Sequence, residues 1–171
     1  MNNNPTPGNM PGGLTTILAK SRGAVAEGGT SNLQAVYEYA EAVTAHGFVY
    51  MDTPGYDPVS ASGQMAGGAK LICFTTGRGS AYGCAPCPLL HIAPNSALRQ
   101  RQEDNMDINC GEIVDGNASV QQMGQRIFDA VLACASGLPS KSKLHGDGQT
   151  EFVPRQLRAV MWIAVNHGEP R

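Results

Sequence analysis

The stretch Leu71-Ile72-Cys73-Phe74-Thr75-Thr76-Gly77-Arg78-Gly79-Ser80 passes from a short apolar run directly into a glycine-rich polar loop. An earlier stretch, Phe48-Val49-Tyr50-Met51-Asp52-Thr53-Pro54-Gly55-Tyr56-Asp57, changes character in the same way. Buried strands that end in polar, glycine-rich loops are typical of open α/β sheets, whose ligands bind in the crevice outside the carboxyl ends of the strands. Two such loops predict an α/β fold with a pocket at one edge of its sheet.

The order of elements around these loops predicts a largely parallel sheet. Strands are expected at 47–52 and 70–76 with a weakly helical segment, 57–68, between them, and strand, helix, strand favours parallel pairing. Further short strands are expected at 89–93 and 106–109. Helices are expected from Leu14 to Gly28, from the capping box Ser31-x-x-Gln34 to Gly47, over 96–104, and over 119–136, where Ser119-x-x-Gln122 forms a second capping box.

The predicted fold class is therefore α/β and Rossmann-like, with a mostly parallel sheet, helices on both faces, and the character of an incomplete part of a larger domain. At 171 residues the chain suits a single α/β domain over 1–171. Its net charge of −2 gives no basic footprint for nucleic acid, and no apolar run is long enough to span a bilayer. The first residues lack a signal-peptide pattern, so a cytoplasmic location without membrane contact is expected.

The loop Gly77-Arg78-Gly79 has two equally weighted interpretations. Its glycines could expose backbone N–H groups to an anion while Arg78 clamps a carboxylate, or it could be an ordinary turn with a solvated arginine. Gly83 follows one residue too late for a G-x-G-x-x-G fingerprint, and no P-loop lysine is present, which disfavours a nucleotide-binding module.

Three aspartates lie at or just past predicted strand ends: Asp52, Asp57 and Asp107. Their oxygens could bind a hard cation, but for any single one a cap or turn role is favoured, and Asp57 before Pro58 has the pattern of an N-cap. The pair Cys84-x-x-Cys87 has metal or redox spacing, yet no second pair exists, so two unrelated small residues are favoured. Lys20 lies off the apolar stripe of its helix, which by spacing alone indicates a solvated side chain.

Taken together, the motifs resemble those of the altronate and galactarate dehydratases, which are sugar-acid hydro-lyases. They occur in order over most of the chain, and the resemblance looks closest to the altronate dehydratase branch. The matching stretches are NPTPGN at 4–9, GGLTT at 12–16, Lys20-Ser21, DTPGYDPVSA at 52–61, ICFTTGRGS at 72–80, MDINCG at 106–111 and EFVP at 151–154. Departures include Ala19, Arg22, Cys87 and Arg155.

This resemblance covers the carboxy-terminal part of such enzymes, which are usually longer. It implies dehydration of an altronate-type or galactarate-type acid to a 2-keto-3-deoxy acid, with a divalent metal of the Fe²⁺ type as cofactor. The implied partners are the small sugar-acid substrate, an amino-terminal half of the same enzyme, and further copies in a homo-oligomer.

Roles follow from the resemblance as hypotheses. Lys20 and Arg78 are assigned to catalysis, and Asp57 and Asp107 to the metal. Substrate hydroxyls and the carboxylate are assigned to Asn9, Thr76, Gly77, Gly79, Ser80 and Asn95. Two alternatives stay open at this point: a non-catalytic remnant or partner subunit of such an enzyme, and a related sulfo-lyase subunit acting on sulfolactate.

Overall fold

The computed structural model describes residues 9–151 and 153, which fall into two compact units. Residues up to 36 together with 44–50 form the first unit, and 37–43 with the residues from 51 onward form the second. The prediction of one domain over 1–171 stays a prediction. None of the helices in the described part is long and apolar enough to cross a bilayer.

The first unit contains a helix and most of a two-stranded sheet. Helix α1 (Ile17–Glu27) begins at Thr16, whose hydroxyl accepts a hydrogen bond from the Ala19 N–H, and none of its residues is buried. Strands β1 (Leu33–Tyr37) and β2 (Phe48–Met51) pair with each other. The predicted helix over 14–28 and the predicted strand over 47–52 are thereby confirmed.

The helix predicted from Ser31 to Gly47 is wrong, because its first part is β1. Gln34 donates its side-chain N–H to the carbonyl of Asn32 at 3.2 Å, so its amide serves a local turn. Ala35 and Tyr37 turn inward while Gln34 and Val36 are exposed, which is the two-residue period of a strand. Pairing with β2 outweighs a weak capping signal, as tertiary context commonly does with local propensity.

The second unit is built on a three-stranded parallel sheet in the order β3-β4-β5, formed by Ile72–Thr75, Leu89–Ala93 and Ile108–Asn109. Ile72 lies opposite Leu89, and Ile92 lies opposite Ile108. All five residues of β4 are buried, as expected for the central strand of a parallel sheet. The strands predicted near these positions are confirmed, but the parallel partner of β3 is β4, whereas β2 pairs with β1.

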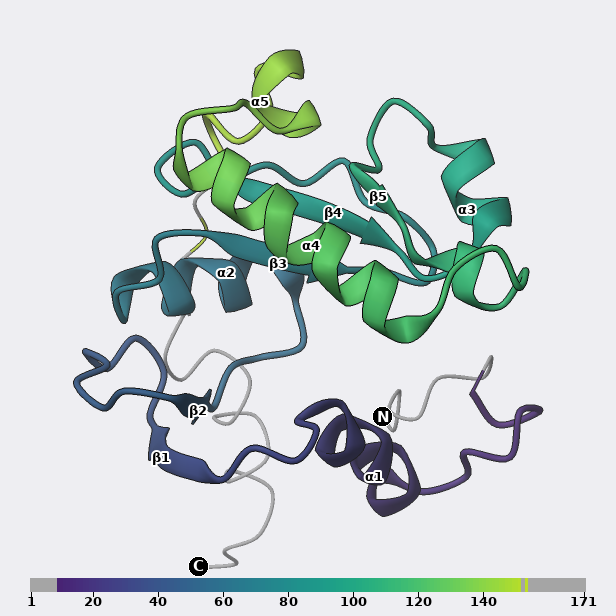
Figure 1. Ribbon diagram of the computed structural model, residues 1–171. Helices are drawn as coiled ribbons and strands as arrows, with labels where there is room; N and C mark the ends of the chain where they lie inside the picture. The colour runs from purple at the N-terminus through teal and green to yellow at the C-terminus, as the bar shows by residue number, and fades with distance from the viewer. Residues whose placement is uncertain (1–8, 152, 154–171) are drawn as a thin grey trace, which may run out of the picture. The chain divides into compact units, whose positions relative to one another are not determined.

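Helices cover both faces of this sheet (Figure 1). Helix α2 (Asp57–Ala66) places Ala61 in a core cluster with Ile72 and Leu89. Cys73 points to the opposite face, since side chains alternate along a strand. There, burial raises the pKa of its thiol, and the nearby Cys134 of α4 (Val120–Ala135) raises it further. The predicted α/β class with helices on both faces is confirmed.

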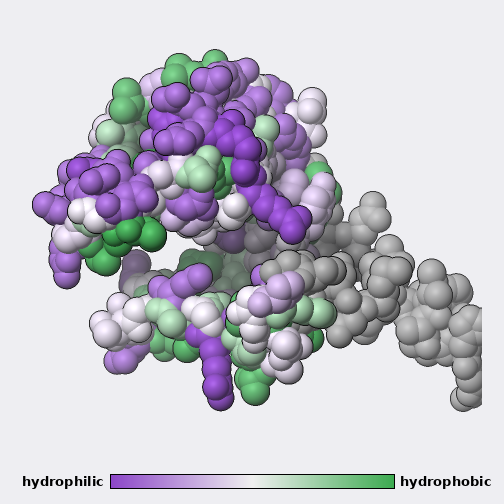
Figure 2. Space-filling view, turned by 90° about the vertical axis from the view of Figure 1, so that its right-hand side faces the viewer, coloured by the Kyte–Doolittle hydropathy of each residue, from purple (hydrophilic) through white to green (hydrophobic). Residues whose placement is uncertain are grey.

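Helices α3 and α5 and a 3₁₀ turn complete the second unit. Helix α3 (Ser96–Arg101) buries Leu98 against Ala93 and Met106, and α4 begins with the predicted Ser119 and Gln122 capping box. A 3₁₀ turn, η1 (Cys110–Ile113), follows β5, and α5 (Lys141–His145) follows α4. Apolar side chains also remain on the surface, where green patches interrupt the polar residues (Figure 2). Three large apolar residues of α4 are exposed: Val120, Phe128 and Leu132.

Candidate functional site at the carboxyl edge of the sheet

The carboxyl ends of β3, β4 and β5 meet at one edge because the three strands are parallel. The segments that leave the strands there are residues 76–80 after β3, the Pro94-Asn95 turn after β4, and Asn109 at the end of β5. We call residues 76–80 the glycine loop. Strand ends at the same edge of an α/β sheet are where such folds commonly bind ligands.

The glycine loop is held in place by contacts to its own backbone. The N–H of Gly79 donates to the Thr76 hydroxyl at 3.2 Å, and Arg101 of α3 donates to the carbonyl oxygen of Arg78 at 3.0 Å. Gly79 has a φ of +94°, and a Cβ there would overlap the side chain of Gln102. Glycine is therefore favoured at 79 for its backbone angle, whereas the flexible Gln102 side chain can move to make space. The arrangement fixes the loop while the Arg78 side chain stays exposed.

The loop also uses the hydroxyl of Ser80, which accepts a hydrogen bond from the N–H of Tyr82 at 3.0 Å. Burial is the main cause that raises the pKa of Tyr82, with a further contribution from Cys84, so this phenol stays protonated. Thr76 and Ser80 are thus both engaged with backbone N–H groups, which orients their oxygens. These side chains were predicted to bind substrate, and that role stays a prediction.

The ends of β4 and β5 carry a second polar group of residues. Asn95 caps α3 by accepting the Leu98 N–H at 2.8 Å. Ser96 accepts a hydrogen bond from the Asn109 side chain at 3.0 Å and donates to Asp115. Gly111 packs so closely that a Cβ would collide with the Ser96 backbone. The amide oxygen of Asn95 thus already serves a helix cap, and its assigned role in substrate binding stays a prediction.

A cavity of about 260 Å³ lies between the segment 53–57 and β3. Its polar lining comes from Thr53, Asp57, Ser60 and Gln64. The Ser60 hydroxyl lies 2.8 Å from the Thr53 hydroxyl and accepts from the Gln64 amide at 3.1 Å. One wall of this cavity is the polar segment 53–57, and another is β3, the strand that leads into the glycine loop.

Asp57 is the first residue of α2, whereas Tyr56 occupies the N-cap position without a side-chain bond. The expectation that Asp57 is an N-cap is therefore wrong by one residue. Pro58 sits in the first turn, where its missing N–H costs nothing, and the Asp57 carboxylate suits the positive end of the helix dipole. Its exposed side chain is nevertheless part of the lining of the 260 Å³ cavity.

Asp107 lies at the other end of β5, just before the strand begins. One carboxylate oxygen accepts the His91 N–H of β4 at 2.7 Å, and the other accepts the Lys141 N–H at the start of α5 at 2.9 Å. The side chain thus joins a strand to a helix. These two contacts account for the position of the side chain without a metal. The metal-binding role assigned to Asp107 stays a prediction.

Asn9 and Lys20 belong to the first unit. The Asn9 carbonyl accepts the Leu14 N–H at 3.1 Å, and Lys20 lies exposed on α1. Their assigned roles in substrate binding and catalysis stay predictions.

The donor set of the described residues does not fit a complete metal site. Within residues 9–151 and 153, no three His, Cys, Asp or Glu side chains gather closely enough to hold an ion. Both oxygens of Asp107 already accept backbone N–H groups. The Fe²⁺ cofactor implied by the resemblance stays a prediction, and no chemical step below is routed through it.

Several residues around the glycine loop and the 260 Å³ cavity were not predicted from the sequence. Arg101 of α3 and the C-cap residue Gln102 support the glycine loop, and Ser60 and Gln64 line the cavity. Arg101 and Gln102 lie more than 20 positions from their partners, so no local pattern could reveal them. Ser60 and Gln64 differ, since their spacing of four places them on one face of the predicted helix over 57–68.

Comparison with known proteins gives a consistent result. The family model described as D-galactarate/altronate dehydratase, C-terminal, matches residues 1–160. Galactarate dehydratase (L-threo-forming) of Escherichia coli is 37% identical over 134 residues, which is 78% of this chain and 26% of that protein. Altronate dehydratase of the same organism is 34% identical over 134 residues, 27% of its length. The chain thus spans about a quarter of the length of these relatives.

A third relative, the (2R)-sulfolactate sulfo-lyase subunit beta of Chromohalobacter salexigens, is 26% identical over 154 residues, 90% of this chain and 39% of that subunit. The identities do not favour the altronate branch that the motifs suggested, because the galactarate enzyme scores slightly higher over an equally long match. The family itself is clear from the match over 1–160. This chain belongs to the D-galactarate/altronate dehydratase family and corresponds to its carboxy-terminal part.

Proposed function

We propose that this chain supplies part of the active site of a hydro-lyase that removes water from a sugar acid of the galactarate or altronate type. The observation that carries the proposal is the family match over residues 1–160, which includes the glycine loop. The loop lies at the carboxyl edge of a parallel sheet, where a ligand is expected. The product would be a 2-keto-3-deoxy acid.

Dehydration of a sugar acid requires removal of a weakly acidic proton next to a carboxylate. Charge that develops on the carboxylate oxygens must be stabilised by positioned donors. The exposed guanidinium of Arg78 suits this task, because it can donate two parallel N–H bonds to one carboxylate. The fixed backbone of the glycine loop would hold Arg78 in position. The oriented oxygens of Thr76 and Ser80 would form hydrogen bonds with substrate hydroxyls. Lys20 is proposed as the base that accepts the proton.

We propose further that the chain works together with an additional polypeptide segment, namely the amino-terminal half of such an enzyme. The chain spans only about a quarter of the two Escherichia coli dehydratases. Helix α1 buries none of its 11 residues and leaves Ile17, Leu18 and Val25 more than half exposed. A helix this short gains most of its stability from packing an apolar face, and the additional segment would supply such packing for α1.

The test is an anaerobic assay of D-galactarate and D-altronate with Fe²⁺, in which 2-keto-3-deoxy acid is measured. This chain is assayed alone and together with Escherichia coli galactarate dehydratase that lacks the matching 134-residue region. Product is expected only when both polypeptides are present. If no product forms with either substrate under any combination, the chain is better described as a non-catalytic remnant.

A second candidate is a role as a sulfo-lyase subunit acting on sulfolactate. It is favoured by one observation: the β subunit of the sulfolactate enzyme matches 90% of this chain, more than the dehydratases do. Sulfolactate is therefore included in the same assay, with sulfite release as the readout. Sulfite without any keto-deoxy acid from the sugar acids would favour this second function.

A further inference from the structure

Cys84 and Cys87 form a tight turn that brings their backbones together. The N–H of Cys87 donates to the carbonyl oxygen of Cys84 at 3.2 Å across Ala85 and Pro86. The two ends of such a four-residue turn lie within about 7 Å of each other. Disulfides join residues whose Cα atoms are about 4.4–6.8 Å apart, so this turn meets the first geometric requirement.

The two thiols also point toward the same part of the protein. The Cys84 sulfur lies 3.8 Å from the sulfur of Met65, near the end of α2, and the Cys87 sulfur lies 3.5 Å from the carbonyl oxygen of Ala69, just beyond it. Both cysteines are free thiols. Side chains that pack against one end of one helix from a single turn are placed to meet each other.

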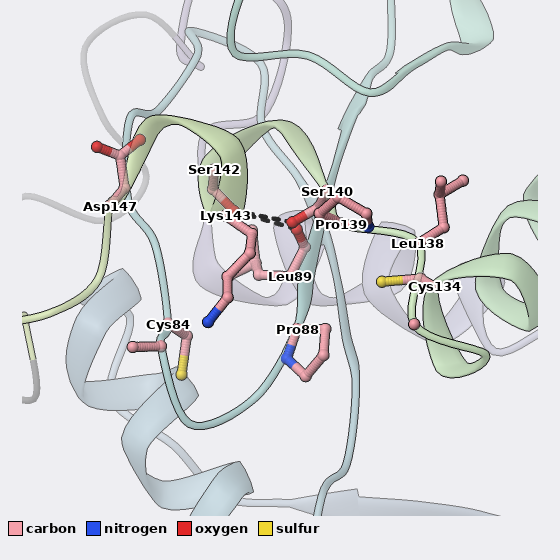
Figure 3. A pocket seen from close by; sticks show the side chains of 12 residues that line it. Cys84, Pro88, Leu89, Cys134, Leu138, Pro139, Ser140, Ser142, Lys143 and Asp147 are labelled. Carbon is pink, nitrogen blue, oxygen red and sulfur yellow. Dashed lines mark hydrogen bonds between the residues drawn. The ribbon is translucent and has the colours of Figure 1, made fainter.

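The two thiols differ in their access to small molecules. Cys87 is 1% exposed, whereas Cys84 is half-buried and lines a cavity of about 160 Å³. Figure 3 shows Lys143 reaching into this cavity from α5, with Cys84 on the adjoining wall. A small oxidant would therefore meet Cys84 first.

We propose that Cys84 and Cys87 are a modification site that closes to a disulfide in the presence of a small peroxide. The Cys84 thiolate attacks a peroxide oxygen, the O–O bond breaks, and the released hydroxide takes up a proton to become water. This leaves a sulfenic acid on Cys84. The Cys87 thiolate then attacks the Cys84 sulfur and expels hydroxide, which is protonated to a second water. Two thiols are oxidised and one peroxide is reduced to two waters.

The attack of Cys87 on the oxidised Cys84 limits the rate, because Cys87 is the buried thiol of the pair. Burial raises the pKa of the Cys87 thiol to about 11, with added contributions from Cys84 and Cys134 and an opposing effect of Lys70. The thiolate fraction of Cys87 therefore rises about tenfold for each pH unit below that value. Disulfide closure should accelerate with pH by a similar factor.

The experiment treats the whole chain with hydrogen peroxide and measures the intact mass, followed by peptide mapping after blocking the remaining thiols. A loss of two hydrogens located to the Cys84–Cys87 peptide is expected, and dithiothreitol should reverse it. Cys87→Ser should trap a sulfenic acid on Cys84 that reacts with dimedone, while the matched control Cys110→Ser should still form the disulfide.

The proposal is overturned if the oxidised wild-type chain contains no Cys84–Cys87 disulfide, or if the bond forms with Cys73, Cys110 or Cys134 instead. The wild-type mapping decides this even if a serine variant fails to fold. No part of the test depends on dehydratase activity, so its failure leaves the proposed function untouched.

Discussion

Replacing Asp107 with alanine tests whether this carboxylate is a structural connector. It accepts the His91 N–H at 2.7 Å and the Lys141 N–H at 2.9 Å, which ties β5 to β4 and to the start of α5. Each hydrogen bond to a charged group contributes about 1.5–3 kcal/mol. Asp107 is only partly buried, so water can replace some of this loss. We expect Asp107→Ala to lower the free energy of unfolding by about 2–4 kcal/mol.

Urea unfolding at pH 7, followed by circular dichroism, measures this change. Asp107→Asn keeps one acceptor oxygen and should lose an intermediate amount. The matched control is Asp129→Ala on the exposed side of α4, where only the Gln125 side chain is bonded, and about 0.5 kcal/mol or less should be lost there. A free energy for Asp107→Ala within about 0.5 kcal/mol of the wild type would refute the connector role. That result would instead favour the metal-binding role predicted for Asp107, because a side chain that only binds a metal is not needed for the stability of the metal-free protein.

Three further predictions concern stability. Gly124 lies inside α4 with open space around it, so Gly124→Ala should stabilise the protein by about 1 kcal/mol in the same urea experiment; a loss would contradict the helix assignment. Gly111→Ala should destabilise by about 2 kcal/mol or more, because its Cβ would collide with backbone atoms of Ser96; an unchanged midpoint would show that the strand end shifts freely. Burial lowers the pKa of His91, partly offset by Asp107 and Asp147, so the unfolded chain binds the proton more readily and stability should fall as pH drops below about 6.5, by up to about 1.4 kcal/mol per unit. His91→Leu should flatten that acid slope, and equal slopes in both proteins would exclude His91 as its source.

Elements with strong local signals could be predicted from the sequence. The helix over 119–136 was found because Ser119 and Gln122 form its capping box and Gly137 follows it. Strand β4 could be predicted because a short apolar run, residues 89–93, ends at Pro94-Asn95, and the structure shows that all five of its residues are buried. These features depend on neighbours within a few positions, which is the range over which a sequence pattern carries information.

Pairing between distant segments could not be predicted in the same way. Ser31 and Gln34 have capping-box spacing, yet Leu33–Tyr37, which contains Gln34, pairs with β2 and forms β1. The strand, helix, strand order around α2 likewise suggested pairing of β2 with β3, whereas β3 pairs with β4. In both cases the partner was decided by tertiary packing, which overrides weak local preferences.

The candidate site shows the same division. The glycine loop could be recognised because glycines and polar residues follow an apolar run, but its support by Arg101 and Gln102 could not. Asp107 looked like a strand-end ligand, and only the structure reveals that its oxygens are bonded to His91 and Lys141. Residue type and position in the sequence indicated which residues could form a site. The hydrogen-bond partners of each polar atom could be identified only from the structure.

We propose that the glycine loop of this chain binds the carboxylate of a sugar acid during dehydration. The most direct measurement replaces the matching region of Escherichia coli galactarate dehydratase with this chain and compares turnover of D-galactarate by the wild-type and Arg78→Ala chimeras. We expect the wild-type chimera to form keto-deoxy acid and Arg78→Ala to lower kcat/KM by about 100-fold or more, the loss of one strong charge-assisted contact in the transition state. Equal kcat and KM in the two chimeras would contradict the account.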